Sequence, residues 1–137
     1  MPRRRLSLLC LVTALLLPIG VSAEEEQASP ASTTAYVEMK PSFVGTIGTG
    51  PRIQYLKADV ALRTEDPAAV AKLEYHDPLI RNALVTLFAR QTVDDLVSLE
   101  GKEALRARAL EAVQTVLTEE EGAPLVDDLL FTNLIVQ

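Results

Sequence analysis

The chain has 137 residues, of which 48% are hydrophobic, and a formal net charge of -6. This length predicts a single domain. The acidic balance argues against binding to nucleic acid and against a polybasic membrane patch, because both need a cationic protein surface.

The first 23 residues have the three parts of a secretory signal peptide. Three arginines precede the apolar run Leu6–Leu17, and the small-residue sequence Val21-Ser22-Ala23 follows it. We therefore expect residues 1–23 to be a signal peptide that is cleaved between Ala23 and Glu24. The alternative is an uncleaved N-terminal membrane anchor, because Leu6–Ala23 is an uncharged run of 18 residues, the lower limit for a bilayer span.

Both interpretations export the remainder of the chain to the periplasm, because the basic end stays in the cytoplasm. Removing residues 1–23 takes away three arginines and no acidic residue, so the formal charge changes from -6 to -9. It also takes away Cys10, the one cysteine of the chain. The exported part is therefore expected to form no disulfide, although its compartment is oxidising.

Residues 24–35 contain no large apolar side chain, so no burial offsets the entropy of ordering them. We expect a flexible linker here, followed by one folded domain at residues 36–137. The domain opens with YVEMKPSFVGTI, a broken alternation in which Pro41 predicts an edge strand or a bulge. Gly48, Gly50 and Pro51 then predict the turn of a hairpin.

The second strand of the hairpin, residues 52–64, has the period-two pattern of a strand with one buried face. The apolar side chains on the predicted core face are Leu56, Ala58, Val60 and Leu62. The polar side chains on the opposite face are Tyr55, Lys57, Asp59 and Arg63.

Two Asp-Pro pairs each predict a helix start, with Asp as N-cap and Pro at the first helical position. Asp66 precedes a short helix over about 67–74, and Asp77 precedes a longer one. The longer helix carries a core-facing stripe of side chains: Ile80, Ala83, Leu84, Leu87 and Phe88.

Thr92 and Asp95 form a capping-box pattern that opens a brief turn through Leu99. A longer amphipathic helix is expected from after Gly101 to about Thr118. The last segment, residues 125–137, is rich in branched residues and predicts a strand that closes the sheet.

This order of elements predicts an α+β fold. The expected sheet is small and antiparallel or mixed, built from the N-terminal hairpin and the C-terminal strand. Several helices cover one of its faces.

Three glycines in the hairpin, Gly45, Gly48 and Gly50, do not fit a phosphate-binding loop, because a strand rather than a helix follows them. The single histidine, His76, is expected to be solvated between two helices. One histidine without cysteine is a poor zinc site. We therefore expect no resident metal or other cofactor.

The paired carboxylates also fail to predict a catalytic site. Asp94 and Asp95 lie in the first turn of a helix, where the dipole favours negative charge. Asp127 and Asp128 lie on a strand, where neighbouring side chains point to opposite faces. With no nucleophile or metal motif nearby, the sequence predicts that the protein is not an enzyme.

The polar face of the second strand is a candidate contact surface. Tyr55, Lys57, Asp59 and Arg63 are either solvent-facing residues of a one-sided sheet or contacts to a partner or to another copy. Tyr, with its apolar ring and polar hydroxyl, and Arg, with its guanidinium group, are residue types typical of protein interfaces.

Several segments together resemble the periplasmic domain of the flagellar basal-body-associated FliL family. They are YVEM with Pro41, YLKADVALRT, DPLIRNALVTLFARQTVDDLVSLEGKEALR and LVDDLLFTNLIVQ. The likeness covers about Tyr36 to Gln137. Its most telling parts are Leu-Glu-Gly-Lys-Glu after an amphipathic helix and the closing Phe-Thr-Asn-Leu-Ile-Val-Gln.

The resemblance implies a non-enzymatic part of the flagellar motor that lies beside the stator units at the inner membrane. It further implies support of torque, homo-oligomeric rings and a stomatin-like fold. Family members usually carry a longer cytoplasmic tail and a clear transmembrane helix. If residues 1–23 are cleaved, this chain would be a soluble periplasmic relative of those family members.

A second function class remains open from the residues alone. The groove between the helix stripe and the sheet would serve a periplasmic binding or adaptor module for an apolar ligand or an envelope protein. Discrete homo-oligomers would favour the motor accessory, and a bound small molecule would favour the binding module.

Overall fold

A computed structural model describes residues 33–137 of the chain. The predicted signal peptide or anchor at residues 1–23, its cleavage site at Ala23 and Glu24, and most of the predicted linker at residues 24–35 lie outside the described residues. None of the helices from residue 33 onward is long and apolar enough to cross a membrane.

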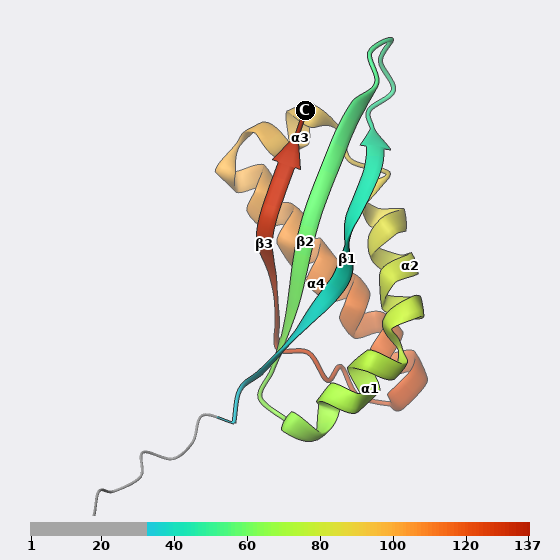
Figure 1. The fold of residues 1–137 in the computed structure, drawn as a ribbon, viewed down its shortest axis with the longest axis vertical. Helices are drawn as coiled ribbons and strands as arrows, with labels where there is room; N and C mark the ends of the chain where they lie inside the picture. The colour runs from blue at the N-terminus through green and yellow to red at the C-terminus, as the bar shows by residue number, and fades with distance from the viewer. Residues whose placement is uncertain (1–32) are drawn as a thin grey trace, which may run out of the picture. The chain divides into compact units, whose positions relative to one another are not determined.

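The sheet has three antiparallel strands in the order β1-β2-β3 (Figure 1). The strands are β1 (Ala35–Ile47), β2 (Gln54–Thr64) and β3 (Asp128–Val136). The predicted hairpin forms β1 and β2, and the predicted C-terminal strand pairs with β2 from the other side. β2 is therefore the central strand, and β1 and β3 are both edge strands.

A 3₁₀ turn and four helices connect β2 to β3. The turn is η1 (Pro67–Ala69), and the helices are α1 (Val70–Tyr75), α2 (Asp77–Phe88), α3 (Val93–Val97) and α4 (Leu99–Glu121). The helices lie on one side of the sheet, with α4 behind the sheet and α2 along the β1 side (Figure 1). This arrangement confirms the predicted α+β class and a sheet covered on one face.

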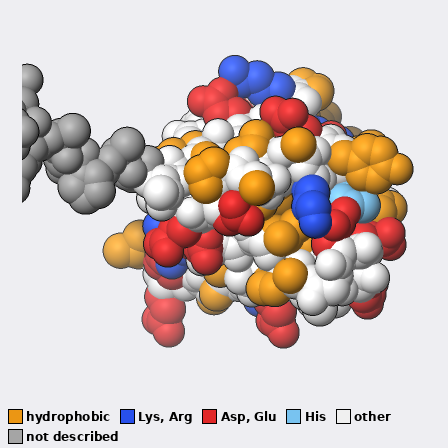
Figure 2. All heavy atoms as spheres, turned by 90° about the horizontal axis from the view of Figure 1, so that it is seen from below, with side chains coloured by type: hydrophobic (Ala, Val, Ile, Leu, Met, Phe, Trp, Pro, Cys, Tyr) orange, Lys and Arg blue, Asp and Glu red, His pale blue; other side chains and the backbone are white. Residues whose placement is uncertain are grey.

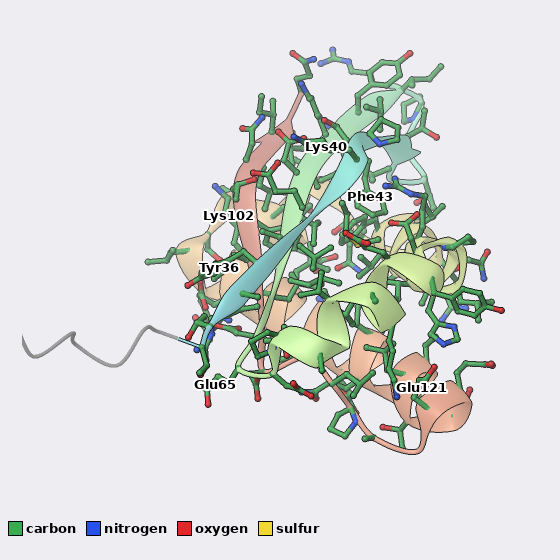
Figure 3. The ribbon with its side chains drawn as sticks, turned by 60° about the horizontal axis from the view of Figure 1, so that its bottom comes forward. Tyr36, Lys40, Phe43, Glu65, Lys102 and Glu121 are labelled. Atoms are coloured by element: carbon green, nitrogen blue, oxygen red, sulfur yellow. The ribbon has the colours of Figure 1, made fainter. Side chains whose placement is uncertain are left out.

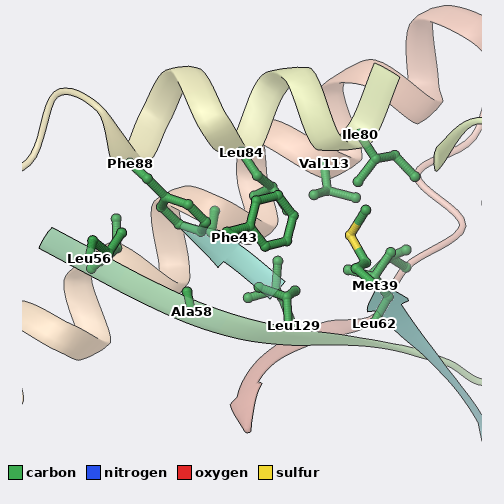
Figure 4. Close-up of a cluster of buried hydrophobic side chains, with 14 of the residues drawn as sticks. Met39, Phe43, Leu56, Ala58, Leu62, Ile80, Leu84, Phe88, Val113 and Leu129 are labelled. Atoms are coloured by element: carbon green, nitrogen blue, oxygen red, sulfur yellow. The ribbon is translucent and has the colours of Figure 1, made fainter. Parts of the chain in front are cut away.

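The core forms where β2 faces α2 and α4. Leu56, Ala58, Val60 and Leu62 of β2 are all at most 2% exposed, as the alternation predicts. They pack with buried residues of both long helices, namely Ile80, Leu84, Phe88, Leu105, Ala109, Val113 and Leu117 (Figure 4). Phe43 and Phe88 meet edge to face with ring centroids 5.4 Å apart, so the core also joins β1 to α2.

Pro41 interrupts β1 where the sequence predicts it. The pairing register between β1 and β2 shifts between Met39 and Phe43. Arg81 of α2 donates a hydrogen bond from Nη1 to the Pro41 carbonyl oxygen at 2.9 Å, and its guanidinium lies 4.5 Å from the centre of the Phe43 ring. The edge of β1 is thus covered at its irregular point, which limits pairing with other chains.

The start of α4 differs from the prediction. The helix begins at Leu99, with Ser98 as its N-cap, and Gly101 lies inside the first turn. The Ser98 Oγ accepts a hydrogen bond from the Gly101 N–H at 3.0 Å. A Cβ at Gly101 would lie 1.8 Å from the backbone oxygen of Asp95. Gly101 is therefore a close-packing residue inside α4, and the prediction that the helix begins after Gly101 was wrong.

The two Asp-Pro pairs behave differently. Asp66 is an N-cap as predicted, because its Oδ1 accepts from the Ala68 N–H at 2.9 Å. Asp77 is the first residue of α2, and the N-cap position belongs to His76, whose side chain makes no capping bond. The second capping prediction was wrong because α1 runs almost directly into α2, so only His76 separates the two helices.

Candidate functional site

One face of the sheet carries no helix among residues 33–137 (Figure 1). The four side chains singled out on β2 all point to this face: Tyr55 is 48% exposed, Lys57 is exposed, and Asp59 and Arg63 are half-buried. Their neighbours across the strands complete the surface, which we call the open face. Whether the four residues contact a partner stays a prediction.

The end of the open face next to the hairpin turn is apolar and cationic. Lys57 is flanked across the strands by Val44 of β1 and Ile135 of β3. Val44 is 70% exposed, and Ile53, in the turn before β2, is 71% exposed. Between Lys40 and Asp59 the chain has two charged residues, Arg52 and Lys57, and both are cations. This end therefore carries positive charge, whereas the chain as a whole is acidic.

The opposite end of the open face is polar. Arg63 lies between Tyr36 of β1 and Asp128 of β3 and pairs with Glu65 at 3.1 Å. Figure 3 shows Tyr36 and Glu65 near this end, where β1 begins. Tyr36 is 58% exposed. Exposed ion pairs of this kind contribute little to stability, so this end is solvated in the isolated domain.

A shallow hollow of about 270 Å³ lies between the two ends, lined in part by Lys40, Ser42, Asp59 and Thr132. The register of β3 against β2 also shifts here, after Asp59. A hydrogen bond from Ser42 lowers the pKa of Asp59, and Asn133 and Lys57 lower it further. Asp59 is therefore a carboxylate at neutral pH and carries a fixed negative charge beside Lys57.

Three of the four residues in the acidic pairs have structural partners. Asp95 closes the predicted capping box with Thr92, which is confirmed. Asp127 accepts from the Glu65 N–H at 2.7 Å, and Asp128 accepts from Arg106 Nη1 at 2.6 Å. Asp127 and Asp128 thus serve separate partners. Within residues 33–137, no three His, Cys, Asp or Glu side chains gather as metal ligands.

Gly48 and Gly50 lie in the predicted turn, whereas Gly45 lies in β1 opposite Leu56. Gly48 has φ +83°, which favours glycine, and its N–H donates to the Gln91 carbonyl oxygen at 3.3 Å. The turn is thus tied to the segment between α2 and α3. No helix N-terminus follows the glycines, in line with the argument against a phosphate loop.

His76 is not solvated, and the sequence expectation was wrong. The residue is 6% exposed, and its Nε2 lies 2.7 Å from Oε1 of Glu121 at the end of α4. Glu121 also pairs through Oε2 with Lys72 of α1 at 2.7 Å. Figure 2 shows the imidazole in pale blue, enclosed among basic, acidic and apolar side chains. Glu121 therefore ties the end of α4 to α1 and to His76.

Two further features lie outside the open face, and only the groove was anticipated from the sequence. A groove of about 180 Å³ lies between β1 and α2, lined in part by Phe43, Val44, Val85 and Phe88. On the other side, Val97 and Leu99 at the junction of α3 and α4 are 71% and 77% exposed. The one available signal was that Val97 and Leu99 are large apolar residues at predicted helix ends.

The chain matches known proteins over the folded segment. Residues 36–137 match the family described as flagellar basal body-associated protein FliL. The chain is 22% identical over 111 residues to the flagellar protein FliL of Aquifex aeolicus, covering 81% of this chain and 66% of that protein. It is 22% identical over 83 residues to the flagellar protein LafL of Vibrio parahaemolyticus, covering 61% of this chain and 50% of that protein.

The matched segments span less than two thirds of either relative. The family match, however, takes in every strand and helix that the structure describes, apart from the first residue of β1. The predicted resemblance is therefore confirmed, and the chain belongs to the family of the flagellar basal body-associated protein FliL.

Proposed function

We propose that the protein is a non-enzymatic accessory of the flagellar motor that lies beside the stator units and supports torque generation. The support is the family match over residues 36–137, together with names of relatives that are flagellar proteins. The role also fits the carboxylates that have partners: Asp95 closes the capping box with Thr92, and Asp128 pairs with Arg106.

The observation that carries the proposal is the open face. A sheet with helices on one side leaves a broad surface for protein contacts, and here its hairpin end combines exposed Val44, Tyr55 and Ile135 with the cation Lys57. Aromatic residues are enriched in protein interfaces. We propose that Tyr55, Lys57, Asp59 and Arg63 contact a motor protein, with Lys57 meeting a carboxylate of that partner.

The proposed location is the periplasmic side of the inner membrane, at the flagellar basal body. In this proposal residues 1–23 direct export and residues 24–35 connect that segment to the folded domain. N-terminal sequencing of the protein recovered from cells distinguishes the two export routes. A start at Glu24 indicates a free periplasmic subunit, whereas a start at Met1 indicates a subunit anchored in the membrane.

The test of the motor function is swimming under load. Cells that lack the protein should swim more slowly in viscous medium, and the wild-type gene should restore them. Lys57→Glu should reproduce the defect, because it reverses the central charge of the hairpin end. Arg63→Glu should have a smaller effect, because Arg63 is half-buried and already paired with Glu65.

The matched control is Glu119→Lys, an exposed charge reversal on the last turn of α4, away from the open face. It should leave swimming unchanged. Normal swimming of the deletion strain under load would contradict the motor function. A normal Lys57→Glu strain beside a slow deletion strain would contradict only the assignment of the open face.

We further propose that copies of the chain associate with one another around the motor. The alternative is a carrier of an apolar small molecule, for which the groove between β1 and α2 is small at about 180 Å³. A larger hollow of about 390 Å³ lies beside β3 and is lined in part by Val93, Leu96 and Leu134. Pockets for drug-sized ligands are roughly 300–1,000 Å³. Native mass spectrometry separates the two: homo-oligomers support self-association, and a bound small molecule supports the carrier.

A further inference from the structure

The groove between β1 and α2 is an apolar depression with a closed floor and open rims. Phe43, Ile47 and Phe88 form its floor and are each 4% exposed, whereas Val44 and Val85 on the rims are 70% and 50% exposed. Its volume of about 180 Å³ suits one or two aliphatic side chains, since a cavity of about 150 Å³ accepts a molecule the size of benzene.

The junction of α3 and α4, residues 97–99, carries two exposed apolar side chains, and Val97 also lines a hollow of about 390 Å³ beside β3. Val97 and Leu99 project into solvent with 71% and 77% of their surface exposed. The junction is also held in place. Ser98 caps α4, and Gly101 packs against the backbone of Asp95 so closely that a Cβ would not fit. The two apolar side chains therefore stand on a fixed turn, which lowers the entropy cost of binding.

The groove and the junction lie on opposite sides of the domain. In Figure 1, α2 runs along the β1 edge of the sheet, and the start of α4 projects beyond the β3 edge. Figure 3 likewise labels Phe43, which lines the groove, and Lys102, in the first turns of α4, on opposite sides. The junction of one copy therefore faces the groove of a second copy that is placed beside it in the same orientation.

The charges beside the two features are of opposite sign. Arg90 follows the groove residues Phe88 and Ala89, whereas Asp94 and Glu100 flank the junction. All three side chains are exposed, and none of them enters an ion pair within the part of the chain that is described. Lys102 is nearby but half-buried. Arg90 of one copy and the two carboxylates of the next would complement each other.

We propose that residues 97–99 of one copy occupy the groove between β1 and α2 of a neighbouring copy. The inference rests on the self-association put forward under the proposed function and supplies its contact surfaces. The two surfaces are different, so the contact is head-to-tail, and each bound copy leaves a free groove and a free junction. Such contacts produce a closed ring when the rotation between copies closes, and a filament when it does not.

Disulfide trapping in intact cells tests this contact with the full chain. In a Cys10→Ala background, Val85→Cys and Val97→Cys together place one thiol on the groove and one on the junction. Oxidation should produce a ladder of cross-linked dimers, trimers and larger species. Each single cysteine variant should remain monomeric, because a head-to-tail contact never brings two identical positions together.

The control pair is Val85→Cys with Glu119→Cys, which moves the second thiol to an exposed position of α4 outside the junction. This pair should form no ladder. Equal ladders from both pairs, or no ladder from Val85→Cys with Val97→Cys, would overturn the contact. Cross-linking of Val97→Cys alone to a dimer would also overturn it, because it would show a symmetric contact.

Charge exchange gives a second arm that does not depend on thiol geometry. Arg90→Glu and Glu100→Lys should each weaken the ladder of the double-cysteine chain, and the two combined should restore it. Failure of the combination to restore it, in variants of unchanged abundance and thermal midpoint, would contradict the proposed pairing. A ladder together with normal swimming of the deletion strain would retain this contact and refute the motor function instead.

Discussion

The Nε2 atom of His76 lies 2.7 Å from Oε1 of Glu121, across 45 residues of sequence. A carboxylate accepts hydrogen bonds only, so Nε2 carries the proton that is shared. Lys72 holds the other oxygen of Glu121 at 2.7 Å. The hydrogen bond from His76 and the ion pair with Lys72 together join the α1–α2 corner to the C-terminal end of α4.

We expect His76→Ala to lower the free energy of unfolding by about 1–3 kcal/mol, because it removes a buried hydrogen bond and leaves a void. Urea denaturation of the purified protein measures this change. Tyr75→Ala is the matched control: its ring is 80% exposed and only touches the His76 ring edge-on, with centroids 4.9 Å apart. A larger loss in Tyr75→Ala than in His76→Ala would contradict the role given to His76.

The carboxylate of Glu121 gives the protein a pH dependence at the acidic end. Hydrogen bonds from Lys72 and then His76 lower the pKa of Glu121 below its ordinary value of 4.5. A lowered pKa in the folded state means that the stabilisation is complete above the ordinary value. It is lost as the pH falls through the lower pKa of the folded protein.

The measurement is the difference in free energy of unfolding between wild type and Glu121→Gln as a function of pH. This difference should shrink as the pH falls below 4.5, the ordinary value of the Glu121 pKa. The comparison with the variant is needed because Asp59 and Asp95 also have lowered pKa values and lose stabilisation in the same direction. A difference that grows on acidification would refute the assignment.

Gly101→Ala should be strongly destabilising, although alanine is normally better than glycine in a helix by about 1 kcal/mol. The added Cβ would lie 1.8 Å from the Asp95 backbone oxygen, so α3 and α4 would have to separate. We expect a loss of at least about 2 kcal/mol in chemical denaturation.

Gly50→Ala is the control for this substitution, because a Cβ there meets no atom within 4 Å. Its effect should stay within about 0.5 kcal/mol. An increase in stability for Gly101→Ala would show that α3 and α4 are not packed as described.

The two Asp-Pro pairs offer a matched test of capping. Asp66→Ala should cost about 1 kcal/mol, because Asp66 caps η1 through the Ala68 N–H. Asp77→Ala should cost less than about 0.5 kcal/mol, because Asp77 only forms a 3.6 Å pair with Arg81 one turn later. Equal losses in thermal unfolding would mean that both residues act as caps.

Much of the fold follows from local patterns. The alternation in β2, the stripe of α2 and the capping box at Thr92 and Asp95 predict the structure correctly, because each depends on residues a few positions apart. Pro41 likewise marks the register shift of β1, because it removes a backbone donor from the ladder.

The wrong predictions concern residues whose contacts come from another helix. His76 reads as a loop residue because its partner Glu121 comes from the end of another helix. The prediction starts the helix after Gly101, because glycine is a poor helix residue and the atom that requires it there, the Asp95 oxygen, belongs to the preceding helix. Neither contact has a signature in the residues next to it.

The sequence by itself determined which helices and strands form, the core face of β2 and the family. These depend on local periodicity and on the order of residues along the chain. Only the tertiary structure decided which surfaces remain free. The groove beside Phe43 and the projecting side chains at 97–99 arise from how α2, α3 and α4 pack on the sheet. Packing joins residues that are far apart in sequence. The pattern along the chain therefore does not reveal which apolar side chains remain exposed after packing.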